Sequence, residues 1–471
     1  MTEITLVVKQ SCETCTLIEP IIRQIAEHFN LRVICQDTQD FPTGLPVEFD
    51  ASLEQSYRLR IEVVPTLIIQ KDGIETSRIF GWDVAAWEAL LGIEFKSDLP
   101  KFRPGCGSKT HDPGMQERLA AQFSGHMLAA RRLNFENVDD IEIGYDQGWS
   151  DGLPVVPPTA ERVMRMLAGT RRQPDEIIGI VPPDFAPCSI EKIAINAVLA
   201  GCRPEYLPVV IAAVEAVLED QFCMHGLLAT TYFSGPMVIV NGPISRAIGM
   251  NSGGNALGQG NRANATIGRA LQLIIRNVGG GRPGGVDRSA LGNPGKYTFC
   301  FSEDETNSCW ESLAVEKGFS SEESTVTVFA ADGMQGLVDQ KSRDPESLCR
   351  SFAAGLRVIG HPKMVQGSDA FLVVSPEHER IFRDAQWNKQ QVKDRLLDLL
   401  MIPGEELIQG AGGIAEGLPE KLRNAVLCKF REGGLNIVRA GGRAGLFSAI
   451  IAGWGASGST GSVPVTRQIQ S

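Results

Sequence analysis

The chain has 471 residues and a formal net charge of −11, with 45 basic and 56 acidic side chains. Its 43% hydrophobic and 21% charged content excludes disordered, collagen-like and coiled-coil chains. The acidic balance argues against nucleic acid or an anionic membrane as a partner. No apolar run reaches the ~18 residues of a spanning helix, and the start MTEITLVVKQ does not resemble a secretory leader. We therefore expect a cytoplasmic protein, whose 11 scattered cysteines indicate thiol chemistry rather than a disulfide framework.

The first 93 residues predict one small domain. Apolar, β-rich runs alternate with stretches whose apolar residues recur with the period of a helix. The predicted elements are strands at 4–9, 31–36, 63–69 and 75–80 and helices at 51–60 and near 84–92. A further helical stretch follows Cys15, with Leu17, Ile18, Ile21, Ile22 and Ile25 on one face. The order is β-α-β-α-β-β-α, with Cys12-Glu13-Thr14-Cys15 at the first strand-to-helix turn and Pro65 entering the third strand.

This combination of CxxC, its position and the proline resembles the thioredoxin family over about residues 1–93. The resemblance implies that Pro65 is cis and faces the CxxC, with Cys12 as the reactive thiol and Cys15 as the resolving thiol. A thiolate is favoured at a helix N-terminus, which suits Cys12. Because Glu13 adjoins that thiolate, we expect it to raise the pKa of Cys12 and make the site a reductant. The alternatives are a zinc half-site, for which no second CxxC is present, or an inert relic.

Residues 94–118 are rich in Pro, Gly and Lys and predict a linker to a large domain at 119–471, which could contain two subdomains. Cys106 lies between two glycines in this stretch. It is either an exposed, mobile thiol that can visit the CxxC or a distant site, or an incidental turn residue.

The large domain predicts an α/β fold with a mixed or parallel sheet. Four apolar runs end in turns that are candidate walls of one site, because ligands of open α/β sheets bind beyond strand ends. The turns begin at Asn241, Ala331, Ser375 and Arg439. The sequence thus predicts a small thioredoxin-like domain followed by a large α/β domain.

Three residues of the large domain are candidate catalytic groups. Asp151 is the only carboxylate in the constrained segment GWSDGLPVVPPT, so it acts as an acid or base or caps a turn. Cys188 and Cys202 each precede an expected helix, where a thiolate is favoured, although cysteines usually pack in cores. No metal site is expected, because the six histidines are dispersed.

The stretch 241–296 holds 14 glycines, seven asparagines and seven basic residues against one acid, Asp287. Glycines let backbone N–H groups approach an anion, and arginine binds carboxylate or phosphate bidentately. The interpretation is an anion pocket, and the alternative is internal salt bridges with the acidic run that follows. Its candidate substrate-binding residues are Asn251, Asn255, Arg262, Asn264, Thr266 and Arg269, with Gly441 and Gly442 as a second cradle.

Three segments of the large domain, GWSDGLPVVPPT, AGCRPEY and RANATIGRA, resemble a widespread bacterial family without a well-defined activity. The similarity spans about 140–465. That family is associated with proteins that carry a UGSC selenocysteine motif, which this chain lacks. The resemblance implies an enzyme but no particular reaction.

The leading hypothesis is a thiol-dependent enzyme for a small anionic substrate, in which the CxxC domain recycles Cys188 or Cys202. The alternatives are a cofactor-free lyase or hydrolase that uses the first domain for docking or oligomerisation, and a non-catalytic thiol-redox partner subunit. We expect no cofactor beyond dithiol chemistry, an external reductant such as thioredoxin reductase or another thiol protein, and a homo-oligomer.

Overall fold

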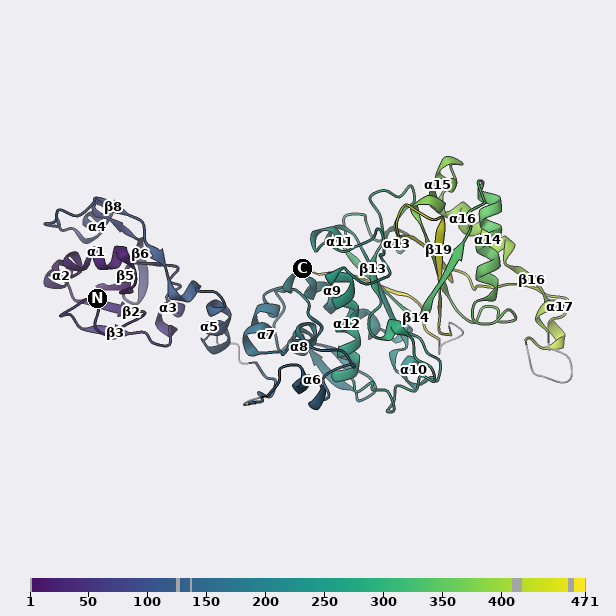
Figure 1. Cartoon of the computed structure of the whole chain (residues 1–471), viewed down its shortest axis with the longest axis horizontal. Helices are drawn as coiled ribbons and strands as arrows, with labels where there is room; N and C mark the ends of the chain where they lie inside the picture. Colours follow the sequence, from purple (N-terminus) through teal and green to yellow (C-terminus); the bar gives the residue numbers. More distant parts are fainter. Residues whose placement is uncertain (1, 124–127, 136–137, 409–416, 456–460, 471) are drawn as a thin grey trace. The chain divides into compact units, whose positions relative to one another are not determined.

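The computed structural model describes all residues except 1, 124–127, 136–137, 409–416, 456–460 and 471 (Figure 1). The chain divides into two compact units, residues 1–128 with 160–164 and residues 129–159 with 165–471. The helix α7 (Ala160–Leu167) contributes to both. None of the described helices is long and apolar enough to cross a bilayer.

The other elements of the first unit are β1 (Thr2–Val8), α1 (Glu13–Leu17), α2 (Glu19–His28), β2 (Leu31–Cys35), β3 (Val47–Phe49), α3 (Glu54–Arg58), β4 (Val63–Val64), β5 (Thr66–Lys71), β6 (Ile74–Phe80), β7 (Trp82–Asp83), α4 (Val84–Leu91), β8 (Phe102–Arg103), β9 (Cys106–Gly107), η1 (Lys109–His111) and α5 (Met115–Phe123). Its main sheet has the order β3-β2-β1-β5-β6. β1 and β2 are parallel, whereas β5 is antiparallel to both β1 and β6. This mixed sheet confirms the α/β arrangement predicted for the N-terminal part.

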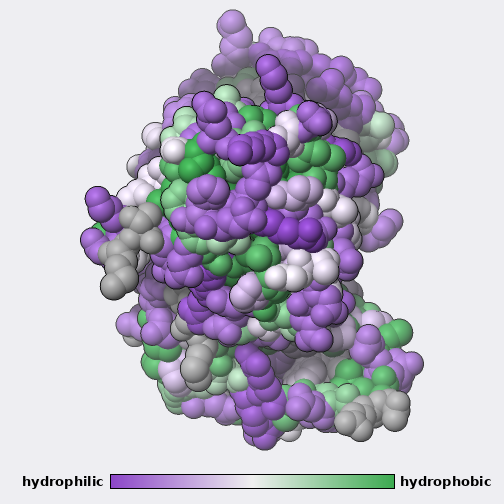
Figure 2. Space-filling model, turned by 90° about the vertical axis from the view of Figure 1, so that its left-hand side faces the viewer, coloured by the Kyte–Doolittle hydropathy of each residue, from purple (hydrophilic) through white to green (hydrophobic). Residues whose placement is uncertain are grey.

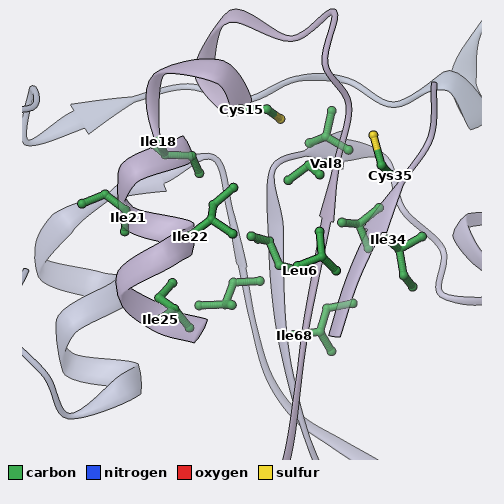
Figure 3. Packing of buried hydrophobic residues seen from close by; sticks show 14 of the residues in the cluster. Leu6, Val8, Cys15, Ile18, Ile21, Ile22, Ile25, Ile34, Cys35 and Ile68 are labelled. Atoms are coloured by element: carbon green, nitrogen blue, oxygen red, sulfur yellow. The ribbon is translucent and has the colours of Figure 1, made fainter. Parts of the chain in front are cut away.

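The core of the first unit forms where one face of the sheet meets α2. The side chains of Ile18, Ile21, Ile22 and Ile25 are fully buried and point toward strand residues that include Leu6 (Figure 3). Each such side chain contributes roughly 1.5–3 kcal/mol by its burial. Pro20, in the first turn of α2, separates α1 from α2, because proline cannot donate the backbone hydrogen bond of a continuous helix. The single helical stretch predicted after Cys15 is therefore divided between two helices.

The surface of the first unit mixes polar and apolar side chains. Ile74, Phe80 and Phe102 are exposed on short strands. The face in Figure 2 shows hydrophobic areas interrupted by hydrophilic ones. Scattered apolar exposure of this kind is ordinary for a folded protein and indicates no particular interface.

The prediction of a linker at 94–118 is wrong for residues 102–111. Residues 102–111 form β8, β9 and η1, and these pack on the first unit: β8 pairs with β7, and β9 pairs with β4. Ser108 and Thr110 are buried. The lack of apolar periodicity misled the prediction, because this segment is held by backbone pairing and polar contacts rather than by an apolar face.

The remaining elements of the second unit are α6 (Glu142–Asp146), β10 (Ile177–Val181), β11 (Ala186–Ser189), α8 (Ile190–Ala200), η2 (Pro204–Tyr206), α9 (Leu207–Val217), η3 (Asp220–Phe222), α10 (Met224–Ala229), β12 (Gly235–Asn241), α11 (Pro243–Ala247), α12 (Arg262–Asn277), η4 (Pro294–Lys296), β13 (Cys300–Ser302), α13 (Leu313–Glu316), β14 (Thr325–Val338), α14 (Pro345–Val358), β15 (Ala370–Val374), α15 (Pro376–Asp384), α16 (Lys389–Leu399), β16 (Met401–Pro403), α17 (Gly404–Leu407), η6 (Glu420–Leu422), β17 (Val426–Cys428), β18 (Leu435–Arg439), β19 (Phe447–Gly453) and β20 (Val465–Gln468).

Its main sheet is mixed, with the order β13-β12-β14-β19-β15-β18 and β20 beside β14. β12 is parallel to β13 and β15 is parallel to β18, whereas the pairs with β14 and β19 are antiparallel. Alternate residues of β15 serve two cores: Phe371 and Val373 face one, and Leu372 and Val374 face the other, which includes α14 and α16 (Figure 1). The large α/β domain is therefore confirmed, with a mixed sheet.

One of the four expected turns is absent. Asp332 lies within β14, at an irregularity of its pairing with β19, so the strand continues where the glycine-containing sequence predicted a turn. The other three turns do follow β12, β15 and β18.

Candidate functional site

Cys12 lies between β1 and α1 and is the N-cap residue of α1. Its Sγ accepts a hydrogen bond from the Cys15 backbone N–H at 3.4 Å and lies 3.5 Å from the carbonyl oxygen of Val64. Val64 precedes Pro65, and the peptide bond between them is cis. The structure thus brings together Cys12, Cys15 and Pro65, as the sequence predicted.

The pKa of Cys12 is lowered from 9.0 to about 5. The largest cause is the hydrogen bond with the Cys15 thiol, and a further hydrogen bond with the Cys106 thiol lowers the pKa as well, whereas burial opposes both. The pKa of Cys15 is raised well above 9.0, chiefly because this thiol is buried. At neutral pH the site therefore holds one thiolate, at Cys12, with a protonated neighbour.

The expected effect of Glu13 is wrong. Its side chain is 82% exposed and forms an ion pair of 2.6 Å with Arg103. A solvated, neutralised carboxylate does not raise the pKa of Cys12, and the pKa moves in the opposite direction. Adjacency in sequence misled the prediction, because side chains of consecutive residues point in different directions from a helix.

Cys106 belongs to the same site. Its Sγ lies 2.7 Å from the Sγ of Cys12, and it is half-buried. Burial, followed by the hydrogen bond to Cys12, raises the pKa of the Cys106 thiol. The prediction of an exposed, mobile thiol is wrong, because β9 holds Cys106 opposite Val64. The expectation that this thiol can reach the CxxC agrees with its position 2.7 Å from Cys12.

The comparisons with known proteins add little to this geometry. No family model and no curated protein matches the chain. Among solved structures, the chain is similar to thioredoxin O2 from Arabidopsis thaliana in its oxidized state, at 22% identity over 20% of this chain and 73% of that chain, with a TM-score of 0.16.

Cys188 and Cys202, the predicted reactive thiols of the large domain, are not placed for reaction. Both are buried, and burial raises the pKa of each to about 12. Cys188 lies in β11, and the N-cap residue of α8 is Ser189 rather than Cys188. Cys202 follows the end of α8, and its thiol donates a hydrogen bond to the carbonyl oxygen of Thr266. The recycling of either cysteine by the CxxC therefore has no support, since a thiol in an apolar environment stays protonated.

Asp151 and Arg269 neutralise one another. The guanidinium of Arg269 donates to both carboxylate oxygens, at 2.9 and 2.7 Å, and to the carbonyl oxygens of Leu153 and Pro154. Both side chains are largely buried. This pair corrects two predictions: Asp151 is not a free base, and Arg269 is not available for a substrate anion.

The other side chains of the predicted anion pocket form hydrogen bonds with nearby backbone groups. The amide of buried Asn264 bonds to the backbone of Asn251 and Ala256, and the side chain of Asn255 donates to the carbonyl oxygen of Gln259. Thr266 donates to the Arg262 carbonyl, and Arg262 Nε donates to the Gly201 carbonyl. These side chains shape the loop, so the predicted pocket is replaced by an internally bonded turn.

A cluster of arginines lies where the turns after β15 and β18 meet. A cavity of about 300 Å³ is lined by Asn307, Pro376, Glu377, Arg380, Arg383, Arg439 and Arg443. Gly441, in the second predicted cradle, donates its N–H to the Ser252 carbonyl at 2.9 Å, and Gly442 packs against Gly254. The two glycines thus place Arg443 beside the asparagine-rich loop and do not themselves face the cavity.

The charges around this cavity are unbalanced. Buried Arg439 is paired with Asp304 at 2.7 Å and with Glu379 at 3.0 Å. Within the described part of the chain, Arg380 and Arg443 have no ion-pair partner. Arg383 lies 3.6 Å from Asp384, so the guanidinium groups of Arg380 and Arg443 remain against the carboxylate of Glu377 and leave a positive surface. Such a surface attracts small anions.

A second cavity, of about 560 Å³, is lined by residues that include Asp151, Arg276, Asp287 and Lys296. Lys296 is paired with Asp287 at 2.7 Å. Asp151 is paired with Arg269, so the charge left unpaired at this cavity is that of Arg276, whose buried Nε has no hydrogen-bond partner among the described residues. Within the described ranges, no group of three or more His, Cys, Asp or Glu side chains is arranged to hold a metal ion.

Proposed function

We propose that the first unit carries out thiol–disulfide exchange, with Cys12 as the attacking thiolate and Cys15 as the resolving thiol. The observation that supports this proposal is the lowered pKa of Cys12, to about 5, beside a protonated Cys15. The thiolate, not the thiol, attacks a disulfide, so Cys12 is ready to react at neutral pH.

The reaction balances without a further cofactor. The Cys12 thiolate attacks one sulfur of a substrate disulfide and releases the other sulfur as a thiolate. Cys15 then loses its proton and attacks Cys12, which releases the second substrate thiol and leaves a Cys12–Cys15 disulfide. The substrate disulfide is reduced to two thiols while the two cysteines are oxidised, and an external thiol protein or reductase reverses the change.

The direction of net transfer follows from the same pKa. A stabilised thiolate favours the reduced form of the pair, which makes its disulfide a stronger oxidant. We therefore expect the oxidised unit to pass its disulfide to substrate dithiols more readily than the reduced unit reduces disulfides. In this direction a substrate thiolate attacks Cys12 and releases Cys15 as a thiol, and a second substrate thiol then displaces Cys12. The disulfide of another thiol protein reoxidises the unit. This direction replaces the earlier expectation of a reductant, which depended on Glu13.

The test uses the full chain, oxidised at its CxxC, and a reduced peptide with two cysteines whose closure is followed by fluorescence. Cys12→Ser should abolish peptide oxidation. In the double variant Cys15→Ser, Cys106→Ser, incubated with the disulfide form of the peptide, a mixed disulfide should remain trapped on Cys12. Cys309→Ser is the matched control, because this thiol is exposed but has its pKa raised to about 11. Full activity of Cys12→Ser would refute the proposal.

For the second unit, we propose that the arginine-lined cavity binds a small anion such as a phosphate, carboxylate or sulfonate. The supporting observation is the pair Arg380 and Arg443, which have no ion-pair partner among the described residues yet line the same cavity. Arginine suits such ligands because its planar fork donates two parallel hydrogen bonds.

Binding of inorganic phosphate to the full chain tests this second proposal. Arg443→Ala removes a charge-assisted contact worth about 1.5–3 kcal/mol, so the Kd should rise at least about ten-fold. Arg350→Ala is the control, since Arg350 is 65% exposed on α14 and pairs with Glu346. Equal phosphate affinity of the two variants and the wild type would show that the cavity is not an anion site.

A further inference from the structure

The segment 102–108 lies across the CxxC as a strap. β8 pairs Arg103 with Trp82, and β9 pairs Cys106 with Val64 in antiparallel register. Between these pairs, the hydroxyl of Thr14, inside the CxxC, donates to the carbonyl oxygen of Pro104 at 2.7 Å. The strap thus contacts both the CxxC and the strand that leads into Pro65.

The strap backbone lies flat against this groove. A Cβ built on Gly105 would lie 2.3 Å from the Val63 side chain and 2.7 Å from the Val64 carbonyl oxygen. A Cβ built on Gly81, whose φ is +71°, would lie 2.8 Å from the Gly105 nitrogen. Only glycine permits such an approach, so the fit is specific to this sequence.

Polar contacts hold the end of the strap beyond Cys106. The Lys9 ammonium donates to the Gly107 carbonyl at 2.7 Å, and the Gln36 amide donates to the Ser108 hydroxyl at 2.7 Å. The Ser108 N–H donates to the Glu62 carbonyl at 2.9 Å. The strap is therefore fixed on both sides of Cys106.

This arrangement leaves Cys12 covered. Cys12 has 0% of its surface exposed, and Cys106 supplies the sulfur in front of it, 2.7 Å away. An external sulfur cannot reach Cys12 while Cys106 keeps this position. Because β9 pairs antiparallel with β4 and opposes Cys106 to Cys12, Cys106 lies where the sulfur of a peptide strand added at this edge would have to lie to reach Cys12.

We propose that the strap is a tethered substrate strand, in which Cys106 is a third redox thiol that forms a disulfide with Cys12 and must leave before an external substrate enters. The inference rests on the proposed exchange activity. In the oxidised unit, Cys106 gives up its proton and attacks Cys12: the Cys12–Cys106 bond forms, the Cys12–Cys15 bond breaks, and Cys15 takes up a proton. The exchange moves one disulfide between two cysteine pairs and changes no oxidation state.

Disulfide mapping of the full chain after treatment with oxidised glutathione tests the new bond. In Cys15→Ser, the glutathione first linked to Cys12 should be displaced by Cys106, giving a Cys12–Cys106 linked peptide as the main product. In the double variant Cys15→Ser, Cys106→Ser, glutathione should remain on Cys12. Cys309→Ser again serves as the control. Persistent glutathione on Cys12 in Cys15→Ser, with Cys106 a free thiol, would overturn the proposal.

Alkylation of reduced Cys12 by iodoacetamide tests whether the strap shields this thiol from external reagents. The double variant Thr14→Val, Arg103→Ala loosens the strap without changing a thiol, and should raise the alkylation rate several-fold. Arg58→Ala, which removes an exposed ion pair with Glu54, should leave it unchanged. An unchanged rate in the loosened variant would overturn the covering role.

The exchange activity and the tethered strand can be refuted independently of each other. Peptide oxidation without a Cys12–Cys106 bond would refute the tethered strand and keep the exchange activity. A Cys12–Cys106 bond without peptide oxidation would refute the exchange activity alone.

Discussion

Replacing Cys15 by alanine should raise the pKa of Cys12 more than replacing Cys106 by alanine. The wild-type pKa of about 5, against an ordinary 9.0, corresponds to a preference for the thiolate of roughly 5 kcal/mol. The thiol of Cys15 makes the largest favourable contribution and that of Cys106 a smaller one. Since a hydrogen bond to a charged group contributes about 1.5–3 kcal/mol, Cys15→Ala should raise the pKa by about one to two pH units.

The measurement is a pH titration of the ultraviolet absorbance of the thiolate under reducing conditions. Subtracting the curve of Cys12→Ser isolates Cys12 from the ten other cysteines. The wild-type midpoint should lie near pH 5, with Cys106→Ala higher and Cys15→Ala highest. A wild-type midpoint near 9, or the reverse order of the two variants, would refute the assignment of these hydrogen bonds.

Three further outcomes are expected. The pKa of Cys12 is lowered on folding, so the Cys12 thiolate stabilises the folded state fully above about pH 9 and loses this effect as the pH falls toward 5. The hydrogen-exchange protection of β1 should therefore differ between wild type and Cys12→Ser at high pH, and this difference should vanish below pH 5. Arg269→Ala should lower the free energy of unfolding in urea by about 3–5 kcal/mol, since it strands a buried carboxylate, and adding Asp151→Ala should restore part of the loss. Cys188→Ser and Cys202→Ser should not change the number of thiols that react rapidly with an aromatic disulfide at about pH 8; a decrease would show that these thiols are reactive after all.

Much of the first unit was predictable from local signals. The strand 75–80 matches β6 (Ile74–Phe80), and the helix 84–92 matches α4 (Val84–Leu91). Apolar periodicity and the turn residues around these elements agree with the fold, so the pattern alone was sufficient. β3 was missed because its three residues carry little periodicity.

In the second unit, the sequence predicted strand positions better than the roles of side chains. The apolar run that precedes the expected turn at Ser375 is the strand β15 (Ala370–Val374). The roles of Asp151 and Arg269 were not predictable, because these residues are 118 positions apart and become partners only when the chain folds. Glycine-rich, arginine-rich composition predicted positive charge in 241–296, but the arginines that line a common cavity come from α15, β18 and the turn after it.

The sequence by itself determined the alternation of strands and helices, the α/β class of both units and the CxxC with its proline, because these depend on periods and spacings within a few residues. Only the tertiary structure decided which polar groups are free. It buried Cys188 and Cys202, joined Asp151 to Arg269, and brought Cys106 over Cys12 from 94 residues away. The reactivity of a thiol or a charge depends on its neighbours in space, and long-range pairing of strands sets those neighbours.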